Sequence, residues 1–223
     1  MVREILWVSV GLLAGGTTFN SSGALVSLWS FDSSSATTPI TADSGIGSQP
    51  GATLAFAGNT RFDNAGTTLN DPRTSPSATF RMEYQASSGK EFILQLTGAN
   101  LSGFQVSYAG EIVSGGTLST VTWSWSTTTA ADTGLAGHTL TTQPGDLTTS
   151  WAVQTADFRG VTQLDGATTI FLKATFSDKD AFDNIQITAT PVPEPVNVAL
   201  ALFGVGFVAW KGLRRRAAEE DRR

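Results

Sequence analysis

Hydrophobic and polar residues alternate with a period of two over much of the chain between residues 25 and 190. The clearest stretch, Ala78–Tyr84, places Ala, Phe, Met and Tyr on one side and Thr, Arg and Glu on the other. A second stretch, Val121–Ser126, separates Val and two Trp from Thr and two Ser. A period of two is typical of β-strands with one face on a core and one in water, so polar positions such as Glu83 are expected to be solvated.

Similar patterns predict about nine strands, separated by turn-forming sequences such as Ser-Gly, Pro-Gly-Asp and Asp-Gly. No segment longer than a turn has helical spacing before residue 191. We therefore predict an all-β fold, a jelly-roll-like antiparallel β-sandwich. Two polar stretches, 33–49 and 127–142, are expected to be surface excursions. The predicted strands are 26–31, 53–57, 78–84, 92–96, 104–108, 121–126, 151–155, 169–176 and 185–189.

The sequence changes character after residue 190. Three prolines in 191–195 disfavour helix, so this stretch is expected to be extended and accessible to a processing enzyme. An uncharged apolar run follows from Val196 to Trp210, and then the basic residues Lys211, Arg214, Arg215 and Arg216. Prolines, an apolar run and basic residues in this order predict a short C-terminal transmembrane helix over 196–213 and a basic cytoplasmic tail over 214–223. An ordinary membrane anchor behind a stiff linker is the alternative interpretation.

The N-terminal 24 residues have the pattern of a secretory signal peptide. Arg3 precedes an apolar run from Ile5 to Leu13, and Ser22-Gly23-Ala24 places small residues before a cut after Ala24. A buried N-terminal strand or helix is the alternative. The chain has no cysteine, so an exported domain over 25–190 must be held together by its core rather than by disulfides.

Residues 191–216 resemble the C-terminal sorting domain of PEP-CTERM proteins. The resemblance lies in Val192-Pro193-Glu194-Pro195 (within the 191–195 motif), the glycine-bearing apolar helix and the basic cluster. It implies export by a Gram-negative bacterium through the secretion translocon, with the ectodomain in the periplasm and the helix transiently in the inner membrane. It also implies recognition by an exosortase, removal of the helix, and delivery to the cell surface or extracellular matrix. Residues 217–223 extend past the basic cluster, where such tails usually end.

Two short segments at the ends of the predicted sandwich carry a second resemblance. Leu28–Asp32 and Ala181–Ile187 look like the first and last strands of exported jelly-roll domains related to carbohydrate-binding modules. The resemblance implies that these terminal strands pair near each other. It does not distinguish a glycan-binding domain from a purely structural relative.

Charge and composition exclude several kinds of chemistry. The net charge of −5 argues against nucleic acid or anionic lipid as a partner. A single histidine, His138, without cysteine or a Gly-x-Ser-x-Gly motif provides neither a zinc site nor a catalytic triad, and we expect it to be an exposed loop residue. Glu83, Glu91 and Glu111 show no spacing that pairs two carboxylates for glycoside hydrolysis. An enzymatic role is therefore not expected.

Two groups of residues are candidate binding sites. Asp178, Asp180 and Asp183, with Asp32 if the terminal strands are neighbours, offer the oxygen ligands of a structural calcium ion. A polar hairpin turn is the alternative for this cluster. Trp123, Trp125 and Trp151 offer aromatic faces for stacking sugar rings, although Trp123 and Trp125 share the predicted core face with Val121, so core packing is the alternative.

These patterns together predict an exported, non-enzymatic protein with a structural or display role at the cell surface or in the extracellular matrix. The alternative is a carbohydrate-binding module that recognises exopolysaccharide, and a second alternative is a polysaccharide-active enzyme. Apart from structural calcium, no cofactor is expected. The partners implied are the translocon, the exosortase and extracellular polysaccharide, with no nucleic acid.

Overall fold

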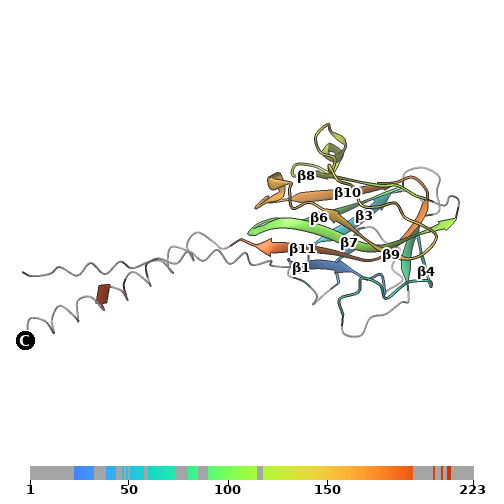
Figure 1. Ribbon diagram of the computed structural model, residues 1–223, viewed down its shortest axis with the longest axis horizontal. Helices are drawn as coiled ribbons and strands as arrows, with labels where there is room; N and C mark the ends of the chain where they lie inside the picture. Colours follow the sequence, from blue (N-terminus) through green and yellow to red (C-terminus); the bar gives the residue numbers. More distant parts are fainter. Residues whose placement is uncertain are drawn as a thin grey trace, which may run out of the picture.

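Two antiparallel β-sheets pack face to face in the computed structural model (Figure 1). Sheet A has the strand order β4-β5-β11-β7-β9, with β1 paired to the later part of β11, and sheet B has the order β2-β3-β6-β10-β8. The structure describes residues 23–32, 39–43, 47, 49, 51–57, 60–73, 80–84, 90–114, 118–192, 203, 207, 210 and 211. This arrangement confirms the predicted all-β antiparallel sandwich.

The strands differ greatly in length. β7 and β11 are the longest, and they pair with each other at the centre of sheet A. Two short 3₁₀ helices, η1 and η2, lie in the connections. The elements are β1 (Ala24–Trp29), β2 (Ile40–Thr41), β3 (Thr53–Ala57), β4 (Thr60–Asp63), β5 (Arg81–Tyr84), β6 (Glu91–Leu96), β7 (Leu101–Ser114), β8 (Val121–Ser126), η1 (Ala131–Gly134), β9 (Ala152–Asp157), η2 (Thr162–Leu164), β10 (Ile170–Phe176) and β11 (Lys179–Pro191).

The chain crosses repeatedly from one sheet to the other. β5, β7 and β9 belong to sheet A, whereas β6, β8 and β10, which follow them, belong to sheet B. This is the pattern expected of a jelly-roll-like sandwich. The first strand lies beside the last, with Ala24 opposite Ala189 and Trp29 opposite Ile185, so the predicted pairing of the terminal strands is confirmed (Figure 1).

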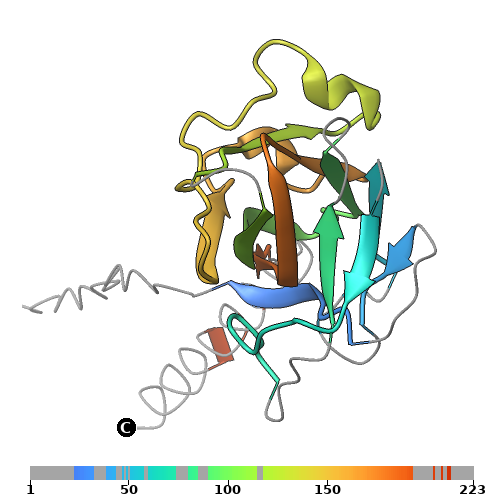
Figure 2. The same ribbon diagram turned by 90° about the vertical axis from the view of Figure 1, so that its right-hand side faces the viewer.

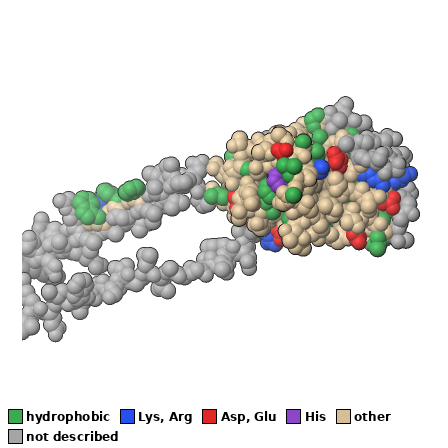
Figure 3. Space-filling view, turned by 90° about the horizontal axis from the view of Figure 1, so that it is seen from above, with side chains coloured by type: hydrophobic (Ala, Val, Ile, Leu, Met, Phe, Trp, Pro, Cys, Tyr) green, Lys and Arg blue, Asp and Glu red, His purple; other side chains and the backbone are tan. Residues whose placement is uncertain are grey.

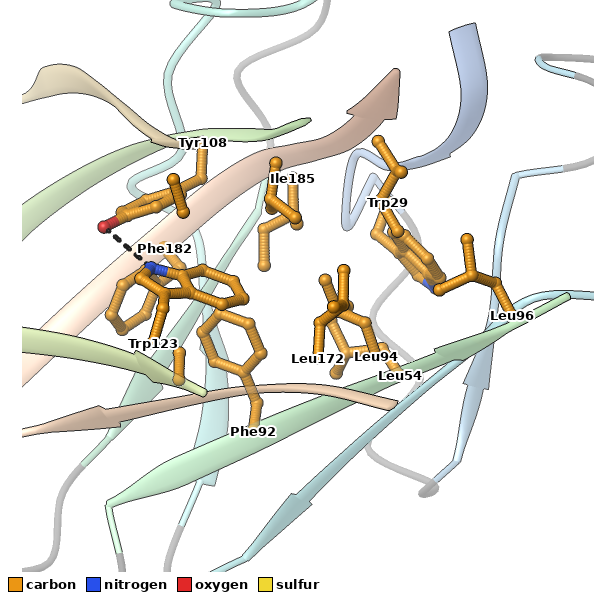
Figure 4. Packing of buried hydrophobic residues seen from close by; sticks show 14 of the residues in the cluster. Trp29, Leu54, Phe92, Leu94, Leu96, Tyr108, Trp123, Leu172, Phe182 and Ile185 are labelled. Carbon is orange, nitrogen blue, oxygen red and sulfur yellow. Dashed lines mark hydrogen bonds between the residues drawn. The ribbon is translucent and has the colours of Figure 1, made fainter. Parts of the chain in front are cut away.

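Aromatic side chains from both sheets fill the space between them (Figure 4). Phe92 of sheet B makes edge contacts with Trp123 and with Phe182 of β11, at centroid distances of 5.5 and 5.2 Å. The indole N–H of Trp123 donates to the hydroxyl of Tyr108 at 3.5 Å, so these two polar groups of the core are partners of each other. A chain without cysteine thus relies on a large aromatic core.

The segment after β8 closes the edge of sheet B. The amide of Trp125 donates to His138 O at 2.8 Å, and the amide of Leu140 donates to Trp123 O at 2.9 Å. The side chain of Gln143 acts like a further piece of strand, because its amide accepts from Trp123 N and donates to Trp123 O. In Figure 2 this segment, in olive and yellow, forms the top of the molecule. The predicted surface excursion over 127–142 therefore protects a sheet edge.

Two strands and the burial of Glu83 were not predicted. β2 and β4 are short, and β4 contains Arg61 and Asp63, which hide the hydrophobic alternation. Glu83, predicted to be solvated, is 3% exposed. Its strand lies between β4 and β11, and Arg81 on the same face accompanies it as a counter-charge. A paired charge can remain on a covered sheet face, where an unpaired one could not.

Most of the predicted targeting segments lie outside the described residues. This is so for 1–22, for Pro193, Glu194 and Pro195, for 214–223, and for most of 196–213. Of the tail, Phe203, Phe207, Trp210 and Lys211 are helical and exposed. Within the part of the chain that is described, no helix is long and apolar enough to cross a membrane. Val192, the first residue of the predicted motif, is 44% exposed and donates its amide to Asn100 O.

Candidate functional site

The outer face of sheet B carries the side chains that alternate with the core residues of β3, β6 and β10. Cross-strand pairing places Gln95 between Thr53 and Phe171, and places Ile93 between Ala55 and Lys173. All six are at least partly accessible to solvent. We call this set the sheet-B face: Thr53, Ala55, Ile93, Gln95, Phe171 and Lys173.

A hollow of about 630 Å³ adjoins the sheet-B face where β3 and β6 meet the residues before β10. Its polar groups are hydroxyls, amides and backbone, and none of its side chains is charged. One wall is fixed by Gln49, whose amide donates to Thr97 O at 2.5 Å and accepts from Thr97 N at 3.0 Å. The lining residues are Pro39, Gln49, Gly51, Ala52, Thr53, Gln95, Leu96, Thr97, Thr168 and Thr169.

Phe171 provides an aromatic surface beside this hollow, because it is the direct cross-strand partner of Gln95. An aromatic ring can pack on the apolar face of a sugar, while amides and hydroxyls can bond its hydroxyl groups in either direction. Farther along the face, Lys173 lies 3.6 Å from the carboxylate of Glu91, so its charge is balanced. The arrangement suits an uncharged ligand with both polar and apolar faces.

The three tryptophans predicted to form a sugar platform do not form one. Trp123 is fully buried in the core, in agreement with the alternative interpretation. Trp125 is 7% exposed, and its ring is covered by His138, which stacks on it at 4.6 Å and 5°. Trp151 is half-buried just before β9, in the other sheet. The sequence does not identify Phe171 as an aromatic residue of the binding face, because it does not show which face of β10 is covered by the rest of the chain.

His138 itself is half-buried rather than fully exposed as predicted. The backbone of its segment pairs with β8, and this pairing places the imidazole over the indole of Trp125. In Figure 3 the histidine, in purple, lies among hydrophobic side chains on a face that is otherwise mostly uncharged. The histidine serves to cover Trp125, and no nucleophile is bonded to it among the described residues.

The four predicted calcium ligands lie in two separate places, and only Asp180 and Asp183 belong to β11. Asp180 is fully buried and accepts a hydrogen bond from the hydroxyl of Ser119 at 2.6 Å. Burial raises the pKa of Asp180 to about 6, and the charge of Asp178 also raises this pKa. The hydrogen bond from Ser119 and the charge of Lys90 lower it. Asp178 and Asp180 are thus neighbours of each other but not of Asp183 and Asp32.

Asp183 is also fully buried, within β11 and not in the hairpin turn of the alternative interpretation. Its two oxygens accept from Thr67 N at 2.7 Å and from Asn184 N at 2.8 Å. Burial raises the pKa of Asp183 to about 7, although these two hydrogen bonds lower it. The carboxylates of Asp32 and Asp71 raise the pKa further. Within the described residues, no three His, Cys, Asp or Glu side chains are grouped so that they could hold a metal ion.

Two of the three glutamates considered for catalysis do come together. The guanidinium of Arg81 bonds Glu111 of β7 and lies 2.9 Å from Glu83, and it also reaches Asp63 at 3.3 Å. Burial raises the pKa of Glu111, whereas Arg81 lowers it. The group is a buried ion network in which one cation bridges three strands of sheet A. With Glu83 covered, it does not favour the enzymatic alternative.

Comparison with known proteins gives a likeness in fold only. No sequence model of a protein family matches the chain, and no curated protein matches it. The xylan-binding domain CBM22-1 of Paenibacillus barcinonensis Xyn10C is similar in structure, with a TM-score of 0.45 and 12% identity over 77% of this chain and 97% of that one. The structure of TmCBM61 in complex with β-1,4-galactotriose gives 0.38 and 10%, over 61% and 88%. A family 35 carbohydrate-binding module from Clostridium thermocellum gives 0.29 and 14%, over 61% and 96%.

Proposed function

We propose that this protein is a non-catalytic carbohydrate-binding domain that binds neutral polysaccharide on the sheet-B face. The observation that supports this most directly is the uncharged hollow of about 630 Å³ next to Phe171. A chain of sugar residues would lie across β6 and β10, with one ring on Phe171 and the next in the hollow beside Gln95. The side chain of Gln95 would bond sugar hydroxyls as donor and acceptor.

The charge of the chain supports a neutral ligand over an anionic one. The net charge is −5, and the one lysine of the sheet-B face is paired with Glu91. An acidic polysaccharide would be repelled by the protein as a whole and would find no unpaired cation on this face. Neutral glycans are therefore expected to bind more tightly than glycans that contain uronic acids.

Binding of the full chain to soluble neutral and acidic polysaccharides, measured by affinity electrophoresis and titration calorimetry, tests the proposal. Phe171→Ala and Gln95→Ala are each expected to weaken binding about fivefold, since one stacking or hydrogen-bonding contact contributes about 1 kcal/mol. Val153→Ala, an exposed apolar substitution on β9 of the other sheet, is the matched control. Retention of all glycans at wild-type strength by both face variants would refute this site.

We also propose that the domain is exported and sorted through its C-terminal PEP-CTERM-like segment. The accessible Val192 and the pairing of Ala24 with Ala189 support this, because the predicted cut after Ala24 lies beside the end of β11, just before the predicted motif. Cleavage after Ala24 and near Glu194 would release the sandwich with every strand except the first residue of β1, Ala24.

The mass of the exported protein tests the sorting proposal. In a producing bacterium with an exosortase, the mature protein is expected to lack residues 1–24 and the apolar tail. A variant truncated before Val192 is expected to remain in the periplasm instead of reaching the surface. If the mature full chain kept its apolar tail, or if the truncated chain reached the surface as the full chain does, the sorting proposal would fail while the glycan proposal would stand.

A further inference from the structure

Four residues on the outer face of sheet B lie in one row across the strands. Gln95 of β6 pairs with Thr53 of β3 on one side and with Phe171 of β10 on the other. Phe171 pairs in turn with Ser126 of β8. We call these four residues the binding row. The hollow of about 630 Å³ lies at its Thr53 end, because Thr53 and Gln95 both line that hollow.

The connection after β8 covers the other end of the binding row. Ser126 belongs to the outer face, because it alternates with the core residues Trp123 and Trp125, yet it is fully buried. η1 contacts both β8 and β10. In Figure 1 the olive segment that contains η1 rises beyond β8, on the side of sheet B away from sheet A, and Figure 2 agrees. The row is therefore closed at Ser126 by a wall, which we define as residues 127–135.

Hydrogen bonds fix this wall to the binding row. The amide of Thr128 donates to Ser126 Oγ at 3.1 Å, and the hydroxyl oxygens of the two residues lie 3.0 Å apart. The hydroxyl of Thr128 also donates to the carboxylate of Asp132. Thr133 is buried, and its hydroxyl donates to Ala130 O at 2.7 Å, which holds the turn of η1. The carboxylate of Asp132 is thus two hydrogen bonds away from the closed end of the row.

Asp132 has the chemistry to bind sugar hydroxyl groups from this position. Hydrogen bonds from Thr128 and Thr129 lower the pKa of Asp132, so its carboxylate is ionised at neutral pH. An ionised carboxylate offers about four acceptor positions, and these two hydroxyls take only part of them. The residue is partly exposed to solvent. Hydrogen bonds from a sugar to such an acceptor are stronger than those to a neutral one.

We propose that the site binds the end of a glycan chain, with the terminal sugar on Phe171 against the wall and with Asp132 accepting from its hydroxyl groups. This rests on the proposed function, because it takes the sheet-B face as the place where sugars bind. A chain that lies along the binding row can continue from Phe171 only toward Gln95 and the hollow. An internal segment of a polymer would have to pass through residues 127–135. The carboxylate also repels an acidic terminal sugar.

Calorimetric titration of the full chain with neutral polymers tests the inference. The probes are linear, size-fractionated xylan, mannan and β-glucan. In every fraction of a polymer that binds, one protein molecule is expected to bind per polymer chain, because each chain has a single end of the right kind. A site for internal segments would bind more protein molecules per chain as the chain becomes longer.

A substitution in the wall tests the role of the carboxylate. Asp132→Asn keeps the shape of the side chain and an oxygen that can accept from Thr128, but it loses the charge. It is expected to weaken binding about fivefold in every fraction. Asp146→Asn is the matched control, since it removes the same charge from an exposed position beside Leu147, which forms a bridge with Ser119 before the start of β8. It is expected to bind as the wild type does.

Two results would overturn the inference alone. The first is a number of bound protein molecules that increases with chain length, while Phe171→Ala still weakens the binding. The second is equal affinity of Asp132→Asn and Asp146→Asn. In both cases sugars would bind on the sheet-B face, but not by their ends against the wall. Absence of binding to any fraction would overturn the proposed function together with this inference.

Discussion

Substitution of Asp180 by asparagine should make the protein more stable at neutral pH and leave it unchanged in acid. Asp180 is fully buried, and its Oδ1 has no hydrogen-bond partner, while Oδ2 accepts from Ser119. Burial raises the pKa of Asp180 from 3.8 to about 6, so the folded state binds a proton more tightly than the unfolded state does. The stability that this proton provides is complete below about pH 4 and is lost as the pH rises through about 6.

The magnitude follows from the same pKa difference. About two pH units, at 1.36 kcal/mol each, correspond to roughly 3 kcal/mol at pH 8. Asparagine is neutral at every pH and retains an oxygen that can accept from Ser119, so Asp180→Asn should gain up to this amount at pH 8 and almost nothing at pH 4.

Urea unfolding between pH 4 and pH 9, with tryptophan fluorescence as the signal, measures this effect. Wild-type stability should fall between pH 4 and pH 8, and Asp183, with a pKa of about 7, should contribute a further fall in both proteins. Asp180→Asn should show a shallower fall. The reasoning would be refuted by a wild-type stability that rises over this range, or by parallel curves for the two proteins.

Three further substitutions test the packing. Trp123→Ala should cost about 3–5 kcal/mol in urea unfolding, because it empties the space between the aromatic rings of the core. Gln143→Ala should cost about 1–3 kcal/mol by leaving the edge of β8 without its side-chain partner, whereas an unchanged stability would mean that water replaces the amide. Gly66→Ala should lower Tm measurably, because a Cβ atom there would lie 2.4 Å from Phe80 O and 2.9 Å from Asp183 Oδ2. A Gly66→Ala protein as stable as the wild type would show that the loop can shift.

The sandwich was predictable because the alternation of hydrophobic and polar residues indicates directly which side chains of a strand are buried. In β10, Ile170, Leu172, Ala174 and Phe176 are buried and the residues between them are not, as the period of two requires. The second half of β7 was missed because Ala109-Gly110-Glu111 interrupts the pattern. The extent of this strand is determined by its long pairing with β11, and no pattern in the neighbouring sequence indicates that pairing.

The candidate site was harder to predict, because it depends on contacts between residues far apart in the chain. The sequence shows that Arg81 and Glu83 share a face, but not that Glu111, 30 residues from Arg81, completes the ion network. Asp183 looks like part of a turn because Asp and Asn are frequent there, yet the residues at 67–69 fold over it and bury it. Phe171 can be preferred to the tryptophans as the aromatic residue of the binding face only when it is known that β10 pairs with both β6 and β8.

The position of β11 has a mechanical consequence for a domain held by its C-terminal end. β11 lies inside sheet A and is bonded to β7 on one side and to β5 and β1 on the other. A force applied beyond Val192 pulls β11 along its own axis, so the ladders on both sides are loaded in shear and many hydrogen bonds share the load at once. A strand at the edge of the sheet, pulled sideways, would lose its bonds one after another. A domain that holds a polysaccharide while it is tethered in flowing water would resist tension through this strand.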